Sequence, residues 1–312
     1  MTSRAVLAPW SQSDRQVFGK HPVRMSHRLA ETGLFDEATL AQVIEDIPES
    51  HYNLTTMGYD HENPDWKEGH LGGNRGQDVI DAIRRGRMWL SMRALEEVDQ
   101  RYRDVLTSMM EEFESEVEDF HTFKRTLGVL ISSPQVRVFY HADVPGQSLW
   151  QISGRKRLYV YPNTEPFLKP EDMEKVVLGM TEEEIPFEPW FDDYAKIYDL
   201  GPGDMVHWPL NGPHQVINED CLNISVTTSH WTRAIRDQYA VNYANGVLRQ
   251  NFGYTPRTTR PTGLSFYPKA ALAVLWKKLN LQKHKKFVRE LKFQIDPKDP
   301  TGISQLRTAM VK

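Results

Sequence analysis

The chain has 312 residues, of which 39% are hydrophobic and 26% charged, and its formal net charge is −4. This length and composition are typical of a globular protein with one large domain or two smaller ones and an ample core. The small negative charge argues against general affinity for nucleic acid or anionic membranes, and no apolar stretch approaches the length of a membrane span.

The first part of the chain, residues 1–125, is predicted to be mainly helical. Residues 36–47 place Leu40, Val43 and Ile44 on one face behind Asp36, a favourable N-cap. Residues 78–85 and 98–120 show helical periodicity as well, and residues 88–92 resemble a strand. We expect an extended arm over residues 1–30, which lack the apolar core of a signal peptide. The glycines of residues 51–76 predict an irregular loop, either a mobile surface segment or a lid over a pocket.

The region that begins with a strand at residues 125–132 carries the chemistry. Val136, Val138 and Tyr140 alternate with the residues between them, which is the period of a strand. A strand through His141 and Asp143 points both side chains to one face. An imidazole and a carboxylate on one face supply two of the three ligands of a facial iron(II) site, which leaves positions for substrate and oxygen.

The next predicted strand contains a cation among inward-facing aliphatic residues. It ends at residues 156–161, where Lys156, Leu158 and Val160 share one face. Burying a lysine is unfavourable unless an anion meets it, so we expect a carboxylate nearby. Residues 163–195 follow as an insert rich in Pro, Glu and Asp, with a short helix at 171–178. Because this insert leaves the barrel near its mouth, it is predicted to form a substrate-facing wall.

A third metal ligand is predicted in residues 200–218. Here a Gly-Pro-Gly-Asp turn precedes an apolar strand at 205–208, a tight loop follows, and His214 begins the next strand. His214 lies 71 residues after Asp143, which suits a ligand on a distant strand of the same barrel. Residues expected either to line the cavity or to lie in the core are Tyr140, Trp150, Tyr159, His207 and Trp208.

The last predicted strand, residues 221–231, carries small polar side chains on one face. Thr227 and Ser229 in this row could hydrogen-bond a bound carboxylate, or the row could face solvent. Cys221 is the single cysteine, which excludes an intrachain disulfide and makes the reducing cytoplasm the expected compartment.

The remaining segment is predicted to be helical over residues 235–248, 269–281 and 285–291. Residues 269–292 hold eight Lys or Arg against one acid. This basic stretch is interpreted as a solvated helix face, with nucleic acid or an acidic partner as the alternative. The apolar side of the same segment could pack on the core or dimerise.

Three features of the sequence together resemble the motifs of a known family. They are His141-Ala-Asp143, Lys156 fifteen residues after His141, and the Gly203-Asp…Pro209…His214 block. They are similar to the Jumonji-C/cupin-like branch of the iron(II)- and 2-oxoglutarate-dependent oxygenases, most closely to asparaginyl hydroxylases of the type that modifies hypoxia-inducible factor. The resemblance covers residues 126–232. It implies that His141, Asp143 and His214 bind Fe(2+) and that Lys156 binds the remote carboxylate of 2-oxoglutarate. An amide replaces Ser229 in those hydroxylases, and their C-terminal helices form a homodimer.

These observations predict an α+β protein with a mainly β core, namely a double-stranded β-helix (jelly-roll/cupin) barrel. Its expected parts are residues 1–125 packing on the barrel, the catalytic core at 126–236 with the insert 163–195, and a helical region at 237–312. The implied activity is 2-oxoglutarate- and O2-dependent hydroxylation of a protein side chain or a small molecule. The alternatives are a cupin sensor that binds a metal or small acid without turnover and, on family resemblance alone, a lysine demethylase.

Overall fold

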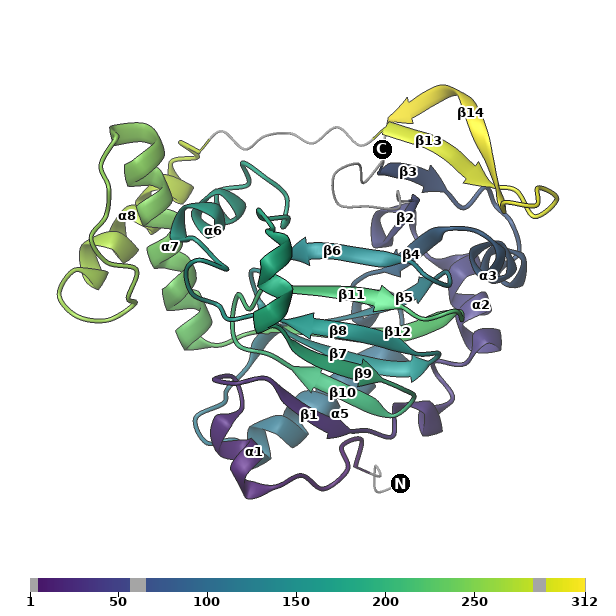
Figure 1. Cartoon of the computed structure of the whole chain (residues 1–312), viewed down its shortest axis with the longest axis horizontal. Helices are drawn as coiled ribbons and strands as arrows, with labels where there is room; N and C mark the ends of the chain where they lie inside the picture. Colours follow the sequence, from purple (N-terminus) through teal and green to yellow (C-terminus); the bar gives the residue numbers. More distant parts are fainter. Residues whose placement is uncertain (1–4, 57–65, 283–289, 312) are drawn as a thin grey trace.

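The computed structural model describes residues 5–56, 66–282 and 290–311 and has two β-sheets at its centre (Figure 1). The larger sheet has the strand order β1-β10-β7-β12-β5-β4-β2-β3-β13-β14, and the smaller one β6-β11-β8-β9. Consecutive strands of the central region alternate between the two sheets, except that β8 and β9 pair with each other in the smaller sheet, as in a double-stranded β-helix. This confirms the predicted jelly roll, whose eight strands are β5 (Phe123–Ser132), β6 (Arg137–His141), β7 (Gly146–Ser153), β8 (Lys156–Val160), β9 (Lys196–Leu200), β10 (Asp204–His207), β11 (His214–Asn218) and β12 (Asn223–Trp231).

The alternation expected from the sequence turns apolar side chains toward the space between the sheets. In β8, Leu158 and Val160 are buried, whereas Arg157 is exposed and Tyr159 is partly exposed. They form one cluster with Leu149 of β7 and Val206 of β10, so the cluster joins strands of both sheets. Burial of these side chains away from water holds the smaller sheet against the larger one.

The N-terminal region adds strands to the larger sheet and helices to its outer face. The strands are β1 (Val23–Ser26), β2 (Tyr52–Thr56), β3 (Lys67–His70) and β4 (Met88–Met92). The helices are α1 (Gln12–Val17), η1 (Leu29–Thr32), α2 (Glu37–Asp46), η2 (Glu49–His51), α3 (Gly76–Arg85), α4 (Leu95–Val98) and α5 (Gln100–Glu116). The predicted helices at 36–47 and 78–85 and the strand at 88–92 are confirmed. The long helix predicted at 98–120 ends four residues early and follows the separate turn of α4.

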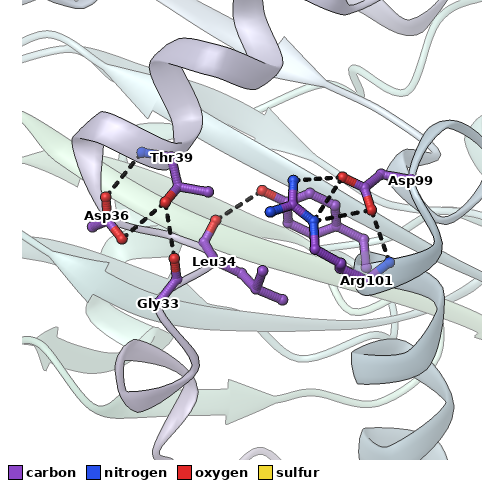
Figure 2. Close-up of polar contacts among 7 residues, drawn as sticks. Gly33, Leu34, Asp36, Thr39, Asp99 and Arg101 are labelled. Carbon is purple, nitrogen blue, oxygen red and sulfur yellow. Dashed lines mark hydrogen bonds and ion pairs between the residues drawn. The ribbon is translucent and has the colours of Figure 1, made fainter.

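Side-chain caps fix where two of these helices begin (Figure 2). The carboxylate of Asp36 accepts a hydrogen bond from the main-chain nitrogen of Thr39 at 2.9 Å, as the sequence predicts for an N-cap. Asp99 caps α5 in the same way through the main-chain nitrogen of Arg101 at 2.8 Å. The segment that leads into α2 is held against α5, because the hydroxyl of Tyr102 donates to the carbonyl of Leu34 at 2.8 Å.

The prediction that residues 51–76 form an irregular loop is wrong for residues 52–56 and 67–70, which are strands β2 and β3. Gly69 lies inside β3, where the ring of Phe293 covers its Cα; a Cβ there would lie 2.3 Å from that ring. The glycine therefore makes room for a neighbouring strand and does not mark a loop. The central part of the predicted lid, residues 57–65, lies outside the described residues.

The insert and the helices that follow the barrel lie together at one end of the barrel strands (Figure 1). The last two strands of the chain extend the larger sheet beyond β3. The insert contains α6 (Pro170–Val177) and η3 (Pro189–Tyr194), and α7 (Arg233–Phe252) and α8 (Phe266–Lys278) follow the barrel. The final elements are the strands β13 (Glu290–Ile295) and β14 (Ile303–Val311), and β13 pairs with β3 in parallel. The predicted helix at 285–291 is therefore wrong at its last two residues, and the others lie outside the described part. Among the described helices, none is long and apolar enough to cross a membrane.

Candidate metal centre

Three side chains that the sequence singles out converge at one end of the barrel. His141 ends β6, Asp143 follows it in the next turn, and His214 begins β11. The Cα atoms of His141 and His214 are direct partners in the antiparallel β6–β11 pairing, and their rings lie 4.0 Å apart between centroids. The Nε2 atom of His214 lies 3.5 Å from Oδ2 of Asp143. One nitrogen or oxygen atom from each of the three residues lies within 4.8 Å of the others, close enough to share a metal ion.

Main-chain carbonyls orient the two imidazoles. Nδ1 of His141 lies 2.7 Å from the carbonyl oxygen of Phe139, and Nδ1 of His214 lies 3.0 Å from that of Gly212. Because a carbonyl oxygen only accepts hydrogen bonds, each Nδ1 must carry the proton. With the proton at Nδ1, Nε2 is the nitrogen of each ring that can bind a metal ion. This outer-shell arrangement is the one that prepares histidines for metal binding.

The electrostatics of the site also favour a cation. Burial raises the pKa of Asp143 to about 7, and Glu183 acts in the same direction, whereas His141 lowers it. Burial lowers the pKa of His214 well below its usual value, so this imidazole is neutral. This buried carboxyl lies beside the neutral imidazole of His214, and a divalent ion would supply a positive charge to it. Two nitrogens and one carboxylate form the facial donor set of non-haem iron(II) sites, so the residues fit this metal.

A cavity of about 360 Å³ opens beside the three candidate ligands. Thr227 and Ser229 of β12 line it, and so does Trp208, the one member of the five predicted wall or core residues that reaches it. Their row continues into Asn223 and Ser225, which are fully buried. The alternative that this face of β12 points to solvent is therefore wrong. Direct contact of Thr227 and Ser229 with a co-substrate stays a prediction.

Lys156 is buried deeper in the barrel than the metal ligands. It pairs with Asn218 on β11, four residues along β8 from Val160, the partner of His214. Lys156 is 3% exposed, and burial lowers its pKa to about 7. It forms no ion pair with an acid in the described part of the chain, and it is not among the residues that line the cavity beside the metal ligands. The described protein residues therefore do not supply the expected anionic partner. That Lys156 binds 2-oxoglutarate stays a prediction.

A second cavity, of about 420 Å³, adjoins the first and was not foreseen from the sequence. Trp89, His141 and Glu183 are among the residues that line both cavities, whereas Trp66 and Glu184 line the outer one. The insert reaches this point, because the main-chain nitrogen of Ala142 donates to the carbonyl of Glu183 at 3.1 Å. The only signal in the sequence was the run of three glutamates at 182–184 within the predicted substrate-facing insert.

Comparison with known proteins supports the fold. A crystal structure of YcfD from Escherichia coli matches with a TM-score of 0.51 at 16% identity, over 90% of this chain and 71% of YcfD. The chain has the fold of the Jumonji-C and cupin-type oxygenases. A further structure, described as the ribosomal oxygenase YcfD in complex with cobalt and 2-oxoglutarate, matches with a TM-score of 0.47 at 16% identity, over 89% of this chain and 69% of that one. No protein-family model and no curated protein sequence matches the chain.

Proposed function

We propose that this protein is an iron(II)- and 2-oxoglutarate-dependent oxygenase that hydroxylates a protein side chain or a small molecule. The observation that carries the proposal is the convergence of His141, Asp143 and His214 beside a cavity in a double-stranded β-helix. The overall reaction balances as R–H + O2 + 2-oxoglutarate → R–OH + succinate + CO2. The fold shared with YcfD agrees with this proposal, and the description of YcfD as a ribosomal oxygenase suggests a protein substrate.

Each chemical role in this reaction falls to a residue whose surroundings suit it. His141, Asp143 and His214 would hold the iron, and the metal with 2-oxoglutarate would supply the oxidising chemistry. The two Nδ1–H···O=C hydrogen bonds keep Nε2 of both imidazoles available. Asp143 must give up its proton when a cation binds. Lys156 would neutralise the remote carboxylate of 2-oxoglutarate, and the hydroxyls of Thr227 and Ser229 would donate hydrogen bonds within the cavity.

The test is spectroscopic and catalytic. Anaerobic addition of ferrous iron and 2-oxoglutarate should give the weak visible charge-transfer band of their chelate, and admission of oxygen should yield succinate. The Asp143→Ala variant should lose the band and turnover because it lacks one of three ligands. Bound iron without a band would refute the oxygenase. A band without succinate above the metal-only blank, with candidate substrates present, would instead support the cupin sensor.

We further propose that the protein forms a homodimer through its C-terminal helices. Val274 and Leu275 of α8 and Leu279 at its C-cap are 66%, 54% and 56% exposed, so this segment presents apolar area that a second copy could bury. Sedimentation equilibrium should show a dimer, and Leu275→Glu should convert it to a monomer. A wild-type monomer at micromolar concentration would refute the dimer without bearing on the metal site.

We place the protein in the cytoplasm, where thiols stay reduced. Cys221 is unpaired, in keeping with a reducing compartment. Cell fractionation tests this placement, and recovery in an extracellular or envelope fraction would refute it.

A further inference from the structure

A third cavity, of about 850 Å³, lies among the N-terminal region, the end of β12 and the start of α7. The buried side chains of its lining are Phe18, His207, Trp208, His230 and Ile235. Trp208 also lines the cavity beside the metal centre, and among the described residues it is the one that the two cavities share. No candidate metal ligand lines the third cavity, so a molecule bound there would not need the metal.

A glycine on the neighbouring strand makes room for the imidazole of His230. His230 lies near the end of β12, directly opposite Gly146 at the start of β7. A Cβ at position 146 would lie 2.6 Å from Nε2 of His230, so the imidazole packs where a larger residue on β7 would place its side chain. Phe120 meets the same imidazole edge to face, with the ring centroids 5.0 Å apart. Gly146 and Phe120 both line the cavity, so they hold the His230 ring at its wall.

His230 is buried at this wall with an unsatisfied polar group. The side chain is 3% exposed, and its Nδ1 has no hydrogen-bond partner in the described part of the chain. The other buried histidines away from the metal centre are paired, since Nδ1 of His207 lies 3.0 Å from Oγ of Ser148 and both nitrogens of His27 form hydrogen bonds. A buried polar group without a partner is unfavourable, so a ligand that hydrogen-bonds to His230 would gain from it.

The deep part of the cavity suits a flat, uncharged molecule. The ring of Phe18 stacks on that of His207, with centroids 4.0 Å apart and an interplanar angle of 9°, and Trp208 adds a further aromatic wall. Burial lowers the pKa values of His207 and His230 to about 3 and 4, so both imidazoles are neutral near pH 7. Neither imidazole then offers a counter-charge to an ion.

Charged side chains lie at the rim of the cavity. Asp237 is half-buried, and its carboxylate is paired with Arg236 at 2.9 Å. The remaining charged lining residues are exposed to solvent, where their effect on a deeply bound ligand is screened; they are Lys20, Glu118, Asp119 and Arg233. Both signs of charge are present, so the rim favours neither an anion nor a cation.

We propose that this cavity binds a neutral, planar and largely apolar molecule that carries a hydroxyl group, with the hydroxyl hydrogen-bonded to His230. Small-molecule sites are typically apolar cavities with a few polar groups that fix the orientation of the ligand. A hydroxyl suits His230 because it can both donate and accept, and therefore matches either neutral tautomer of the ring. The aromatic walls would cover the faces of the ligand. The site is separate from the proposed iron centre and does not depend on oxygenase activity.

Three naphthalene derivatives test the polarity of this site. The full-length protein is loaded with Zn(II) and 2-oxoglutarate, so that the metal centre is already occupied. Equilibrium dialysis, read by naphthalene fluorescence, then compares 2-naphthol with 2-methylnaphthalene, which has the same shape but no oxygen, and with 2-naphthoate, which is an anion. We expect 2-naphthol to bind about three- to tenfold more tightly than 2-methylnaphthalene, and 2-naphthoate to bind more weakly than both.

Substitutions in the lining place the probe. His230→Phe keeps an aromatic ring and removes the nitrogens, so it should reduce the affinity for 2-naphthol to that for 2-methylnaphthalene. His21→Phe is the matched control, since His21 is exposed and does not line the cavity, and it should preserve the preference. Ala234→Trp fills the cavity from an exposed lining position that tolerates a larger side chain, and it should weaken both neutral probes by at least about tenfold.

Several results would overturn the proposed site. They are equal affinity for 2-naphthol and 2-methylnaphthalene, tightest binding of 2-naphthoate, and unchanged 2-naphthol binding in Ala234→Trp. The metal-free Asp143→Ala variant should bind 2-naphthol as the wild type does, and loss of binding there would assign the probe to the metal centre instead. Because Ala234→Trp changes an exposed residue, its result decides the location even if His230→Phe fails to fold.

Discussion

The side-chain amide of Asn211 donates a hydrogen bond to the main-chain carbonyl of Asp143, with Nδ2 and O 2.6 Å apart. Asn211 lies in the loop between β10 and β11, three residues before His214, and has a left-handed backbone with φ of 55°. One residue therefore connects the segments that carry two of the candidate metal ligands, although it touches no metal position itself.

This contact predicts that Asn211 positions the metal ligands. Asn211→Gly keeps the left-handed backbone accessible and removes the amide, and it should weaken Co(II) binding by about tenfold. Asn211→Ala should weaken binding similarly and also destabilise the protein by about 1 kcal/mol, because alanine disfavours positive φ. Metal titration and urea unfolding measure the two effects. Unchanged Co(II) affinity in both variants would show that the hydrogen bond does not matter for the ligands.

Lys156 should destabilise the free protein and favour co-substrate binding. Its folded-state pKa of about 7 is below its unfolded value, so the unfolded chain binds more protons between pH 7 and about 10. Stability of the protein without 2-oxoglutarate should therefore rise with pH in this range. Lys156→Met should remove this rise, stabilise the free protein at pH 7 by about 1 kcal/mol or more, and weaken 2-oxoglutarate on the order of a hundredfold.

Urea unfolding and 2-oxoglutarate titration measure these two effects of Lys156→Met. Lys196→Met on the neighbouring strand is the control, since Lys196 is exposed. A Lys156→Met variant with wild-type affinity for 2-oxoglutarate would contradict the role of this lysine.

His27 should make the metal-free protein sensitive to mild acid. Its Nε2 lies 3.0 Å from the carbonyl of Gln151, and its Nδ1 accepts from the main-chain nitrogen of Leu29 at 3.1 Å, so the neutral ring uses both nitrogens. Burial lowers its pKa to about 4. Between pH 6.5 and 4 the unfolded state binds the extra proton, so stability falls as pH falls.

Replacement of His27 by glutamine tests this acid sensitivity, because glutamine can still donate and accept but cannot become charged. His27→Gln should reduce the slope of unfolding free energy against pH by about 1.4 kcal/mol per unit in the middle of the range. Urea unfolding at several pH values measures the slope. Burial also lowers the pKa values of His207 and His230, to about 3 and 4. These two histidines should therefore account for the pH dependence of the unfolding free energy that remains in the variant. Identical slopes for the two proteins would refute the assignment.

The ion pair between Glu174 and Arg249 should hold α6 against α7. Nε of Arg249 lies 2.8 Å from Oε2 of Glu174, a carboxylate that is almost fully buried and whose pKa burial raises. Arg249→Met leaves that carboxylate without its partner and should destabilise the protein by about 3 kcal/mol. The double variant Glu174→Leu/Arg249→Met should be far closer to wild type. Unfolding of the single and double variants in urea measures the coupling, and strictly additive losses would contradict it.

The barrel and its metal ligands could be predicted because their determinants are local. The alternation around Tyr140, the two-residue spacing of His141 and Asp143, and the turn before β10 each lie within about ten residues. The sequence places His214 at the start of a strand, and β11 begins at that residue. Family resemblance supplied the one non-local step, which is that His214 belongs with His141.

Features that depend on distant partners could not be predicted in this way. Gly69 resembles a loop residue until Phe293 is seen to cover it, and these residues are 224 positions apart in the chain. The same holds for Gly76 at the start of α3, where a Cβ would lie 1.9 Å from the carbonyl of Ala41. The parallel pairing of β13 with β3 likewise has no local signature, because parallel partners are joined by long connections. The outer cavity is likewise assembled from five separate segments, which are β2, β3, β4, β6 and the insert.

The short strand β1 has a consequence beyond the site. Val23 to Ser26 pair residue for residue with His207 to Asp204, and Arg24 binds the carboxylate of Asp204 at 2.9 Å. Without this strand, β10 would present a bare row of amide and carbonyl groups. Such a row invites another molecule to add its own strand and begin a growing aggregate. The pairing with β1 therefore satisfies the backbone groups of β10 within the molecule, at a distance from any chemistry in the barrel.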